Sequence, residues 1–76
     1  MIRPDSALAP ETWLHGVLSS KSVADGHVIR RKIRDIERFV GMDRFLEEIR
    51  LRGFRAIENR GYVIVICNQA PIRRLV

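Results

Sequence analysis

The residues of this sequence best able to do chemistry are cations gathered near its middle. With one further arginine in a turn-like stretch, they are Arg30, Arg31, Lys32, Arg34, Arg38 and Arg60. A guanidinium carries a rigid fork of donors that matches phosphate oxygens and guanine edges, whereas an ammonium acts as a point charge. We therefore predict that these residues contact a nucleic acid, either DNA or RNA, through its phosphates.

Acidic residues within the same stretch support a different interpretation. Asp35 and Glu37 lie among the cations, and Asp35 follows Arg31 at the i, i+4 spacing of a helical ion pair. A solvated surface of ion pairs would have this composition without binding anything. The residues alone leave both interpretations open.

Residue types that carry catalysis or bind metals are few and scattered. His15 and His27 have no partner at metal-ligand spacing, and Cys67 ends an apolar run, where a thiol is typically an inert part of the core. No glycine-rich loop of the kind that cradles phosphates is present. We therefore predict no enzymatic activity, no cofactor and no metal.

The length and composition of the chain indicate one small basic domain. Its 76 residues suffice for a single core, 46% of them are hydrophobic, and the formal net charge is +5. A basic surface of this kind favours a polyanionic partner. The single cysteine excludes an intramolecular disulfide, which a small secreted domain would usually need.

No segment has the pattern of a leader peptide or a membrane span. Residues 1–6 lack an apolar stretch, and the longest apolar run, Tyr62 to Cys67, is far shorter than the roughly 20 residues that span a bilayer. We expect a soluble, cytoplasmic protein that does not bind membranes.

A first amphipathic helix is predicted over residues 10–19, after a flexible N-terminus at 1–9. Pro10 suits the first position of a helix, where its missing N–H is not needed. The apolar stripe of this helix comprises Trp13, Leu14, Val17 and Leu18. We expect Trp13 to anchor the core and not to stack on nucleic-acid bases.

A second amphipathic helix is predicted over residues 43–52. Gly41 suits the stop of a preceding helix, Asp43 suits an N-cap, and Gly53 suits the end of this helix. The buried stripe comprises Phe45, Leu46 and Ile49. These residues recur at helical spacing, which distinguishes the segment from a strand.

The segment 28–40 has two possible structures. Its apolar residues, Ile29, Ile33, Ile36 and Val40, recur at helical spacing, and Arg30, Arg34 and Arg38 would then form a row on the opposite face. Alternatively, residues 28–33 form a strand that leads into a shorter helix from Arg34. We favour the single helix and leave the strand as the alternative.

The last third of the chain has the pattern of antiparallel strands. Residues 54–58 alternate loosely, Asn59-Arg60-Gly61 is a turn sequence, and Tyr62 to Cys67 is a continuous run typical of a strand buried on both faces. Ile72 to Val76 would close the sheet. The predicted fold is therefore α+β, with two to three helices on a small C-terminal antiparallel sheet (a hairpin or a three-stranded meander), in one domain at 10–76.

The order helix, turn, helix, basic hairpin resembles a winged helix, with Gly41 at the turn. A tight helix-turn-helix needs a small residue four positions before that glycine, where Glu37 stands. It also needs apolar residues six and nine positions after it, where Glu47 and Arg50 stand. The residues therefore predict that the tight motif is absent.

The stretch from Phe45 to Val76 resembles HicA-type mRNA interferases, notably at Arg52-Gly53-Phe54 and Arg60-Gly61-Tyr62. The resemblance implies a fold like that of double-stranded-RNA-binding domains. Those toxins carry a histidine just after the turn, where this chain has Tyr62-Val63-Ile64. The resemblance thus implies the fold and not the ribonuclease activity.

Most of the chain also resembles a family of short bacterial proteins labelled N-(5′-phosphoribosyl)anthranilate isomerase. The resemblance lies in residues 25–38, in Arg52-Gly53-Phe54 and in Val65-Ile66-Cys67-Asn68. The enzyme of that name is a (β/α)8 barrel of at least about 200 residues. A chain of 76 residues cannot form such a barrel, so the resemblance implies no activity.

These observations predict a small nucleic-acid-binding or regulatory protein that uses an arginine-rich face. The alternative is a non-catalytic protein-interaction module, an adaptor or inhibitor of a larger complex. Its surface would be the helical stripe around Trp13 and Leu14, or a sheet edge near Ile72 to Val76. A homodimer would relieve the marginal stability of so short a chain.

Overall fold

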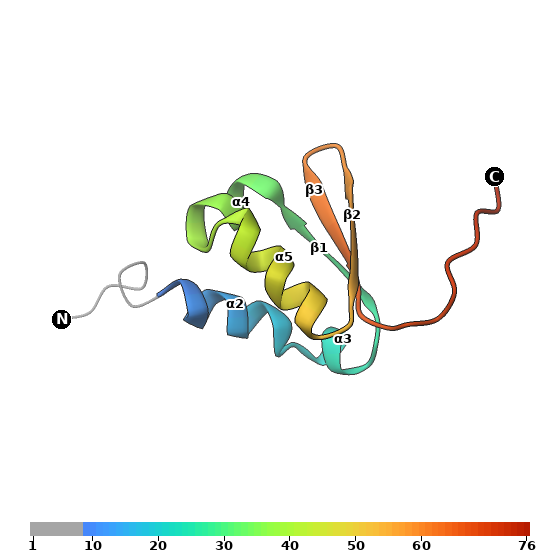
Figure 1. The fold of residues 1–76 in the computed structure, drawn as a ribbon, viewed down its shortest axis with the longest axis horizontal. Coiled ribbons are helices and arrows are strands. Elements are labelled where there is room, and N and C mark those ends of the chain that lie inside the picture. The colour runs from blue at the N-terminus through green and yellow to red at the C-terminus, as the bar shows by residue number, and fades with distance from the viewer. Residues whose placement is uncertain (1–8) are drawn as a thin grey trace.

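The computed structural model describes residues 9–76 (Figure 1). In chain order the elements are α2 (Pro10–Leu18), α3 (Lys21–Ala24), β1 (Val28–Lys32), α4 (Ile33–Phe39), α5 (Met42–Leu51), β2 (Arg55–Asn59) and β3 (Tyr62–Ile66). The predicted α+β class and both predicted amphipathic helices are confirmed. The predicted flexible N-terminus lies, apart from Ala9, outside the described residues.

The sheet has three antiparallel strands in the order β1-β3-β2, so the last strand in the chain lies in the centre. Val65 of β3 lies opposite Ile29 on one side and Ala56 on the other. The predicted C-terminal hairpin is confirmed, but the third strand of the alternative, a meander, comes from residues 28–32 and not from residues 72–76. Since β1 and β2 occupy both edges of β3, no edge of the central strand is left for the end of the chain.

The predicted single helix over residues 28–40 is wrong, and the alternative of a strand followed by a shorter helix is confirmed. Residues 28–32 form β1, and the helix α4 begins at Ile33. Ile29 and Ile36 are both buried, at 7% and 0% exposed, as a shared helical stripe would require. However, Ile29 reaches the core from strand β1, so its spacing from Ile36 does not indicate one helix. The predicted row of Arg30, Arg34 and Arg38 along one helix therefore does not exist.

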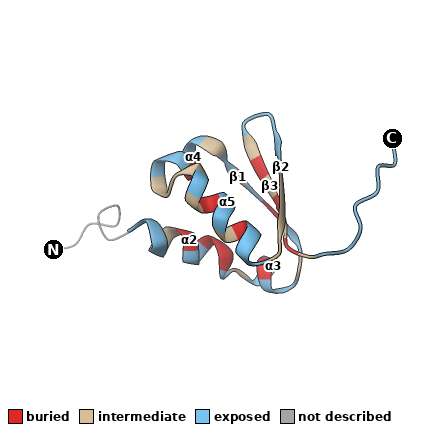
Figure 2. Ribbon diagram, viewed as in Figure 1, coloured by how far each residue is buried: buried red, intermediate tan, exposed pale blue. Residues whose placement is uncertain are grey.

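The four helices of the described residues pack on one face of the sheet, and the core lies between these two layers (Figure 2). The buried residues comprise Leu14, Val17, Leu18, Val23, Ile29, Ile36, Phe45, Ile49, Val63, Val65 and Cys67. Trp13 is half-buried, packs against the core and stacks on Phe39 with ring centroids 5.3 Å apart. Leu14, Val17 and Leu18 of the same stripe are buried, so little of the stripe is left exposed for a partner.

Only one face of β3 is buried. Val63 and Val65 are 4% and 0% exposed, whereas Tyr62, Ile64 and Ile66 are half-buried on the face that no described helix covers. We call this second surface the open face. By strand alternation and register it comprises Val28, Arg30, Lys32, Arg55, Ile57, Asn59, Tyr62, Ile64 and Ile66. The prediction that this strand is buried on both faces is wrong.

The predicted cap of α5 also differs, whereas the predicted turn between the last two strands is confirmed. Helix α5 begins at Met42 with Gly41, at φ 88°, as its N-cap, so Asp43 lies in the first turn and does not cap it. The turn between β2 and β3 consists of Arg60 and Gly61, with φ of 50° and 80°. Positive φ at both positions is the geometry of a two-residue hairpin whose twist matches its strands.

No helix among residues 9–76 is long and apolar enough to cross a membrane.

Replacing Gly61 with alanine should destabilise the domain by about 1–2 kcal/mol, because a Cβ is disfavoured at this positive φ. Gly16→Ala is the matched control, because the new Cβ would also meet no atom within 4 Å but the position is helical. It should stabilise the domain by about 0.5–1 kcal/mol, since glycine loses more conformational entropy in a helix. Urea unfolding followed by circular dichroism measures both changes. Equal effects of the two substitutions would contradict the assigned turn.

Candidate nucleic-acid interface

The candidate site lies where strand β1 ends at Lys32 and helix α4 begins at Ile33. Lys32 is still extended, at φ −68° and ψ 135°, and it lies opposite Tyr62 of β3. The next residue, Ile33, begins α4 and donates its backbone N–H to the carbonyl of Gly61 at 2.9 Å. This hydrogen bond fastens the start of the helix to the tip of the hairpin.

A hollow opens where the helix meets the hairpin. Its volume is about 380 Å³. We call it the cationic hollow, and its lining residues are Lys32, Ile33, Arg34, Arg60, Gly61 and Tyr62. It is lined by three cations and no carboxylate, so an anion entering it would meet only attractive charges. Cations from three elements of the fold, the end of a strand, a helix and a turn, converge here.

The open face continues from the hollow through a stacked pair. The guanidinium carbon of Arg30 lies 4.4 Å from the centroid of the Tyr62 ring, which is a cation–π contact. Ile64, opposite Arg30 in the register, extends the surface with apolar side-chain area. A planar cation over an aromatic ring is the kind of surface on which nucleic-acid bases stack.

Of the six predicted contact residues, the structure gathers four and separates two. Lys32, Arg34 and Arg60 line the hollow and Arg30 lies beside it. Arg31 lies on the other face of β1 by strand alternation, where its Nη1 donates to the carbonyl of Arg30 at 2.7 Å. Arg38 lies one turn beyond Arg34 on α4, with its guanidinium carbon 5.4 Å from the centroid of Phe39.

The predicted ion pair between Arg31 and Asp35 is absent from the described part of the chain. The pairing assumed that both residues lie on one helix, but Arg31 lies on β1 and Asp35 on α4. The i, i+4 spacing brings side chains together only within a helix. The interpretation of this stretch as a surface of ion pairs therefore loses the one pair that the spacing predicted.

The arginines that do pair with carboxylates lie between α2 and α5. Arg44 contacts Glu11 at 2.8 Å and Glu48 at 2.9 Å, and Arg52 contacts Glu48 at 2.9 Å. Hydrogen bonds from Arg44 lower the pKa of the Glu11 carboxyl. Those from Arg52, and then from Arg44, lower the pKa of Glu48. This network joins α2 to α5 and neutralises its own charges.

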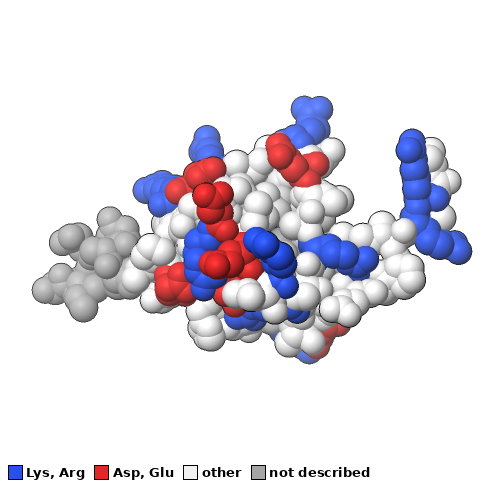
Figure 3. All heavy atoms as spheres, in the orientation of Figure 1, with Lys and Arg blue, Asp and Glu red and all other residues white. Residues whose placement is uncertain are grey.

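The exposed side of α5 has mixed charge. Asp43, Glu47 and Arg50 are all exposed on it, and Figure 3 shows acidic and basic groups side by side over this helix. In a helix-turn-helix the second helix enters the major groove of DNA. Carboxylates there would repel the phosphates on either side of the groove, so α5 is a poorer anion surface than the cationic hollow.

The other residues with chemical potential lie apart. Cys67 is buried at 5% exposed, and burial raises the pKa of its thiol, as expected for an unreactive core cysteine. Within residues 9–76, no group of three or more histidine, cysteine, aspartate or glutamate side chains could hold a metal ion.

Tyr62 belongs to the site, although the sequence predicts it to lie in a strand buried on both faces. Its position directly after Arg60-Gly61 was the signal that could have found it, because a residue beside a hairpin tip lies at the end of the sheet. The face of the sheet on which the Tyr62 side chain lies depends on the pairing of β3 with β1 and β2.

Replacing Arg44 with methionine should raise the carboxyl pKa of Glu11 more than that of Glu48, because Glu48 keeps its contact with Arg52. Lowered carboxyl pKa values stabilise the fold above the unfolded pKa, and this stability is lost as pH falls through the folded values. The variant should therefore lose less stability on acidification. NMR titration of the side-chain carboxyl carbons measures both pKa values. A larger shift at Glu48 than at Glu11 would contradict the network.

Comparison with known proteins adds no assignment to this geometry. No protein-family model matches the chain, and neither a curated protein nor a solved structure matches it. The resemblances seen in the sequence remain predictions. The geometry of the cationic hollow and of the open face is therefore the basis for a functional assignment.

Proposed function

We propose that this domain binds nucleic acid through the cationic hollow and the adjoining part of the open face. The observation that carries the proposal is the convergence of Lys32, Arg34 and Arg60 around one hollow with no carboxylate in its lining. Gathering like charges costs free energy in the isolated protein, and an anionic ligand offsets this cost. The formal net charge of +5 adds a long-range attraction for a polyanion.

In the proposed complex the three cations of the hollow neutralise successive phosphates of the backbone. Arg34 and Arg60 supply donor forks, and Lys32 supplies a point charge. The Arg30–Tyr62 pair then receives a base or a sugar from the same strand. Arg38 extends the contact along α4, whereas Arg31 takes no part because it lies on the opposite face of β1.

The salt dependence of binding should show how many phosphates are neutralised. With about three contacts, the slope of log K against log salt should be near −2.7 for duplex DNA and near −2.1 for single strands. For a duplex this predicts a loss of affinity of about 40-fold between 50 mM and 200 mM salt. Fluorescence anisotropy with short random duplex DNA, single-stranded DNA and RNA measures the slopes. Absence of binding to all three at low salt would refute the proposal.

Charge reversal should locate the surface. Arg34→Glu and Arg60→Glu should each weaken binding by about tenfold and reduce the salt slope by about one, because each removes a phosphate contact. Arg50→Glu is the matched control, because it makes the same charge change on the exposed side of α5. It should change the affinity by no more than about twofold.

Equal losses in all three variants would mean that binding follows net charge, and that the hollow is not the site. Circular dichroism of each variant checks that the fold is retained. Since the side chains of Arg34, Arg50 and Arg60 are all exposed, none of the three substitutions should unfold the domain.

A further inference from the structure

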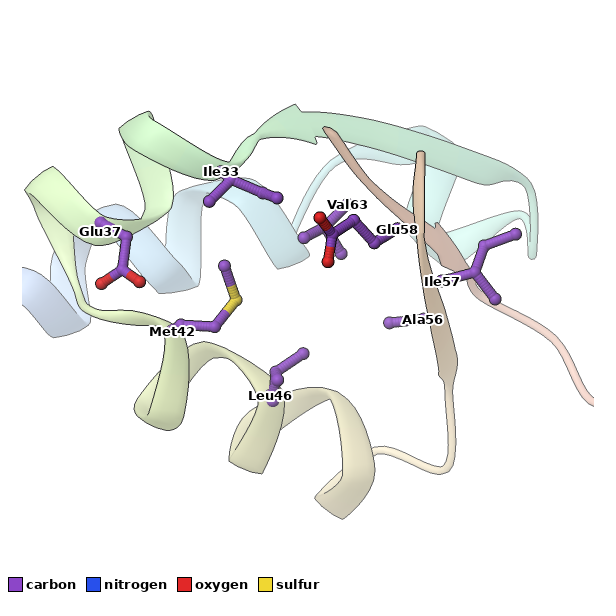
Figure 4. A pocket seen from close by; sticks show the side chains of 8 residues that line it. All are labelled: Ile33, Glu37, Met42, Leu46, Ala56, Ile57, Glu58 and Val63. Atoms are coloured by element: carbon purple, nitrogen blue, oxygen red, sulfur yellow. The ribbon is translucent and has the colours of Figure 1, made fainter. Parts of the chain in front are cut away.

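A second concave surface lies on the helical side of the sheet, between α4, α5 and β2 (Figure 4). Its volume is about 390 Å³. We call it the apolar groove, and its lining residues are Ile33, Glu37, Met42, Leu46, Ala56, Ile57, Glu58 and Val63. In Figure 4, Ala56 and Glu58 extend from β2 toward the cavity, whereas Ile57 points away from it.

The groove combines an accessible apolar floor with two carboxylates. Leu46 is 39% exposed, and Met42 and Ala56 are half-buried. Glu37 and Glu58 are exposed at the groove and make no ion pair within residues 9–76. No cation lines the groove. An occupant that fits it would therefore be apolar and would carry a positive charge.

Residues 71–76 have this chemistry and are unpartnered. The segment Pro71-Ile72-Arg73-Arg74-Leu75-Val76 has no regular structure, and Ile72, Leu75 and Val76 are 59%, 83% and 104% exposed. Within the described residues, the hydrogen bonding of Arg74 is to the carbonyl of Val76, at 2.7 Å. Exposing three large aliphatic side chains within so short a segment is unfavourable unless something covers them.

The course of the chain directs this segment away from its own groove. Nη2 of Arg55 donates to the carbonyls of Asn68 and Ala70, at 2.9 and 2.6 Å, which fastens the chain at the end of the sheet. Pro71 then restricts Ala70 to extended conformations, which disfavours an immediate reversal. In Figures 1 and 4 the segment leaves on the side of β2 away from the groove.

We propose that residues 71–76 of one copy of this chain dock in the apolar groove of a second copy, and reciprocally, to form a symmetric dimer. The outer edge of β2 borders the groove and is unpaired by any strand of residues 9–76, among which β2 pairs with β3 alone. An extended segment can add to such an edge through main-chain hydrogen bonds. The apolar side chains then cover the floor of the groove, and an arginine meets its carboxylates.

Strand alternation selects which arginine enters the groove. In an extended chain Ile72, Arg74 and Val76 share one side, and Arg73 and Leu75 share the other. The side with two aliphatic residues flanking one cation matches the apolar groove with its carboxylates. Arg74 therefore points toward Glu37 and Glu58, and Arg73 points to solvent.

The test is the oligomeric state of matched charge variants, measured without nucleic acid by sedimentation equilibrium at about 0.1 M salt. The wild type should approach twice the monomer mass of 8.8 kDa as its concentration rises. Arg74→Glu, and separately Glu37→Arg with Glu58→Arg, should each raise the dimer dissociation constant at least tenfold. Arg73→Glu is the matched control and should change it by less than about threefold.

Mixing the two disrupted variants distinguishes a second copy from the chain's own segment. In the mixture each segment faces a groove of opposite charge, so a heterodimer should form with both contacts restored. Docking of the segment in its own groove would give no such restoration. A wild type that stays monomeric near 1 mM, a mixture that does not associate, or equal effects of Arg73→Glu and Arg74→Glu would each overturn the proposal. Circular dichroism checks that every variant is folded.

Discussion

The strand β3 is hydrogen-bonded along both edges, and the position of every surface described above depends on this pairing. In antiparallel strands successive side chains alternate between two faces. The observed register places Val63 and Val65 under the helices and Tyr62 and Ile64 on the open face. A slip by one residue would exchange the two sets. The same register thus determines both the core and the candidate interface.

The same tertiary arrangement places some cations beside carboxylates and gathers others in a hollow whose lining has no carboxylate. Arg44 and Arg52 are held by carboxylates between α2 and α5, which leaves that region near neutrality. Lys32, Arg34 and Arg60 meet no carboxylate in the hollow. Water in a surface hollow weakens the repulsion between like charges, so the cluster destabilises the fold less there than it would in the interior. The three cations therefore remain accessible to an anion.

Surface that the small core cannot bury is left on two sides of the sheet. A domain of this size buries only about 60% of the surface of its unfolded chain. The cationic hollow at the end of the open face is lined by Lys32, Arg34 and Arg60, whereas the lining of the apolar groove includes Glu37 and Glu58. The linings of the cationic hollow and of the apolar groove have Ile33 in common.

The sequence by itself determined the helices α2 and α5, the hairpin, the α+β class and the presence of a cation cluster. These features depend on local periodicity, on turn residues and on composition, all of which can be read along the chain. What it could not determine was the structure of residues 28–32. Ile29 fits a helical stripe and a strand equally well, and the pairing of this segment with β3 decides between them. The same pairing decided that Arg30 lies over Tyr62, that Arg31 turns away, and that Arg60 joins Lys32 and Arg34. Contacts between residues far apart in the chain depend on strand register, which local sequence does not encode.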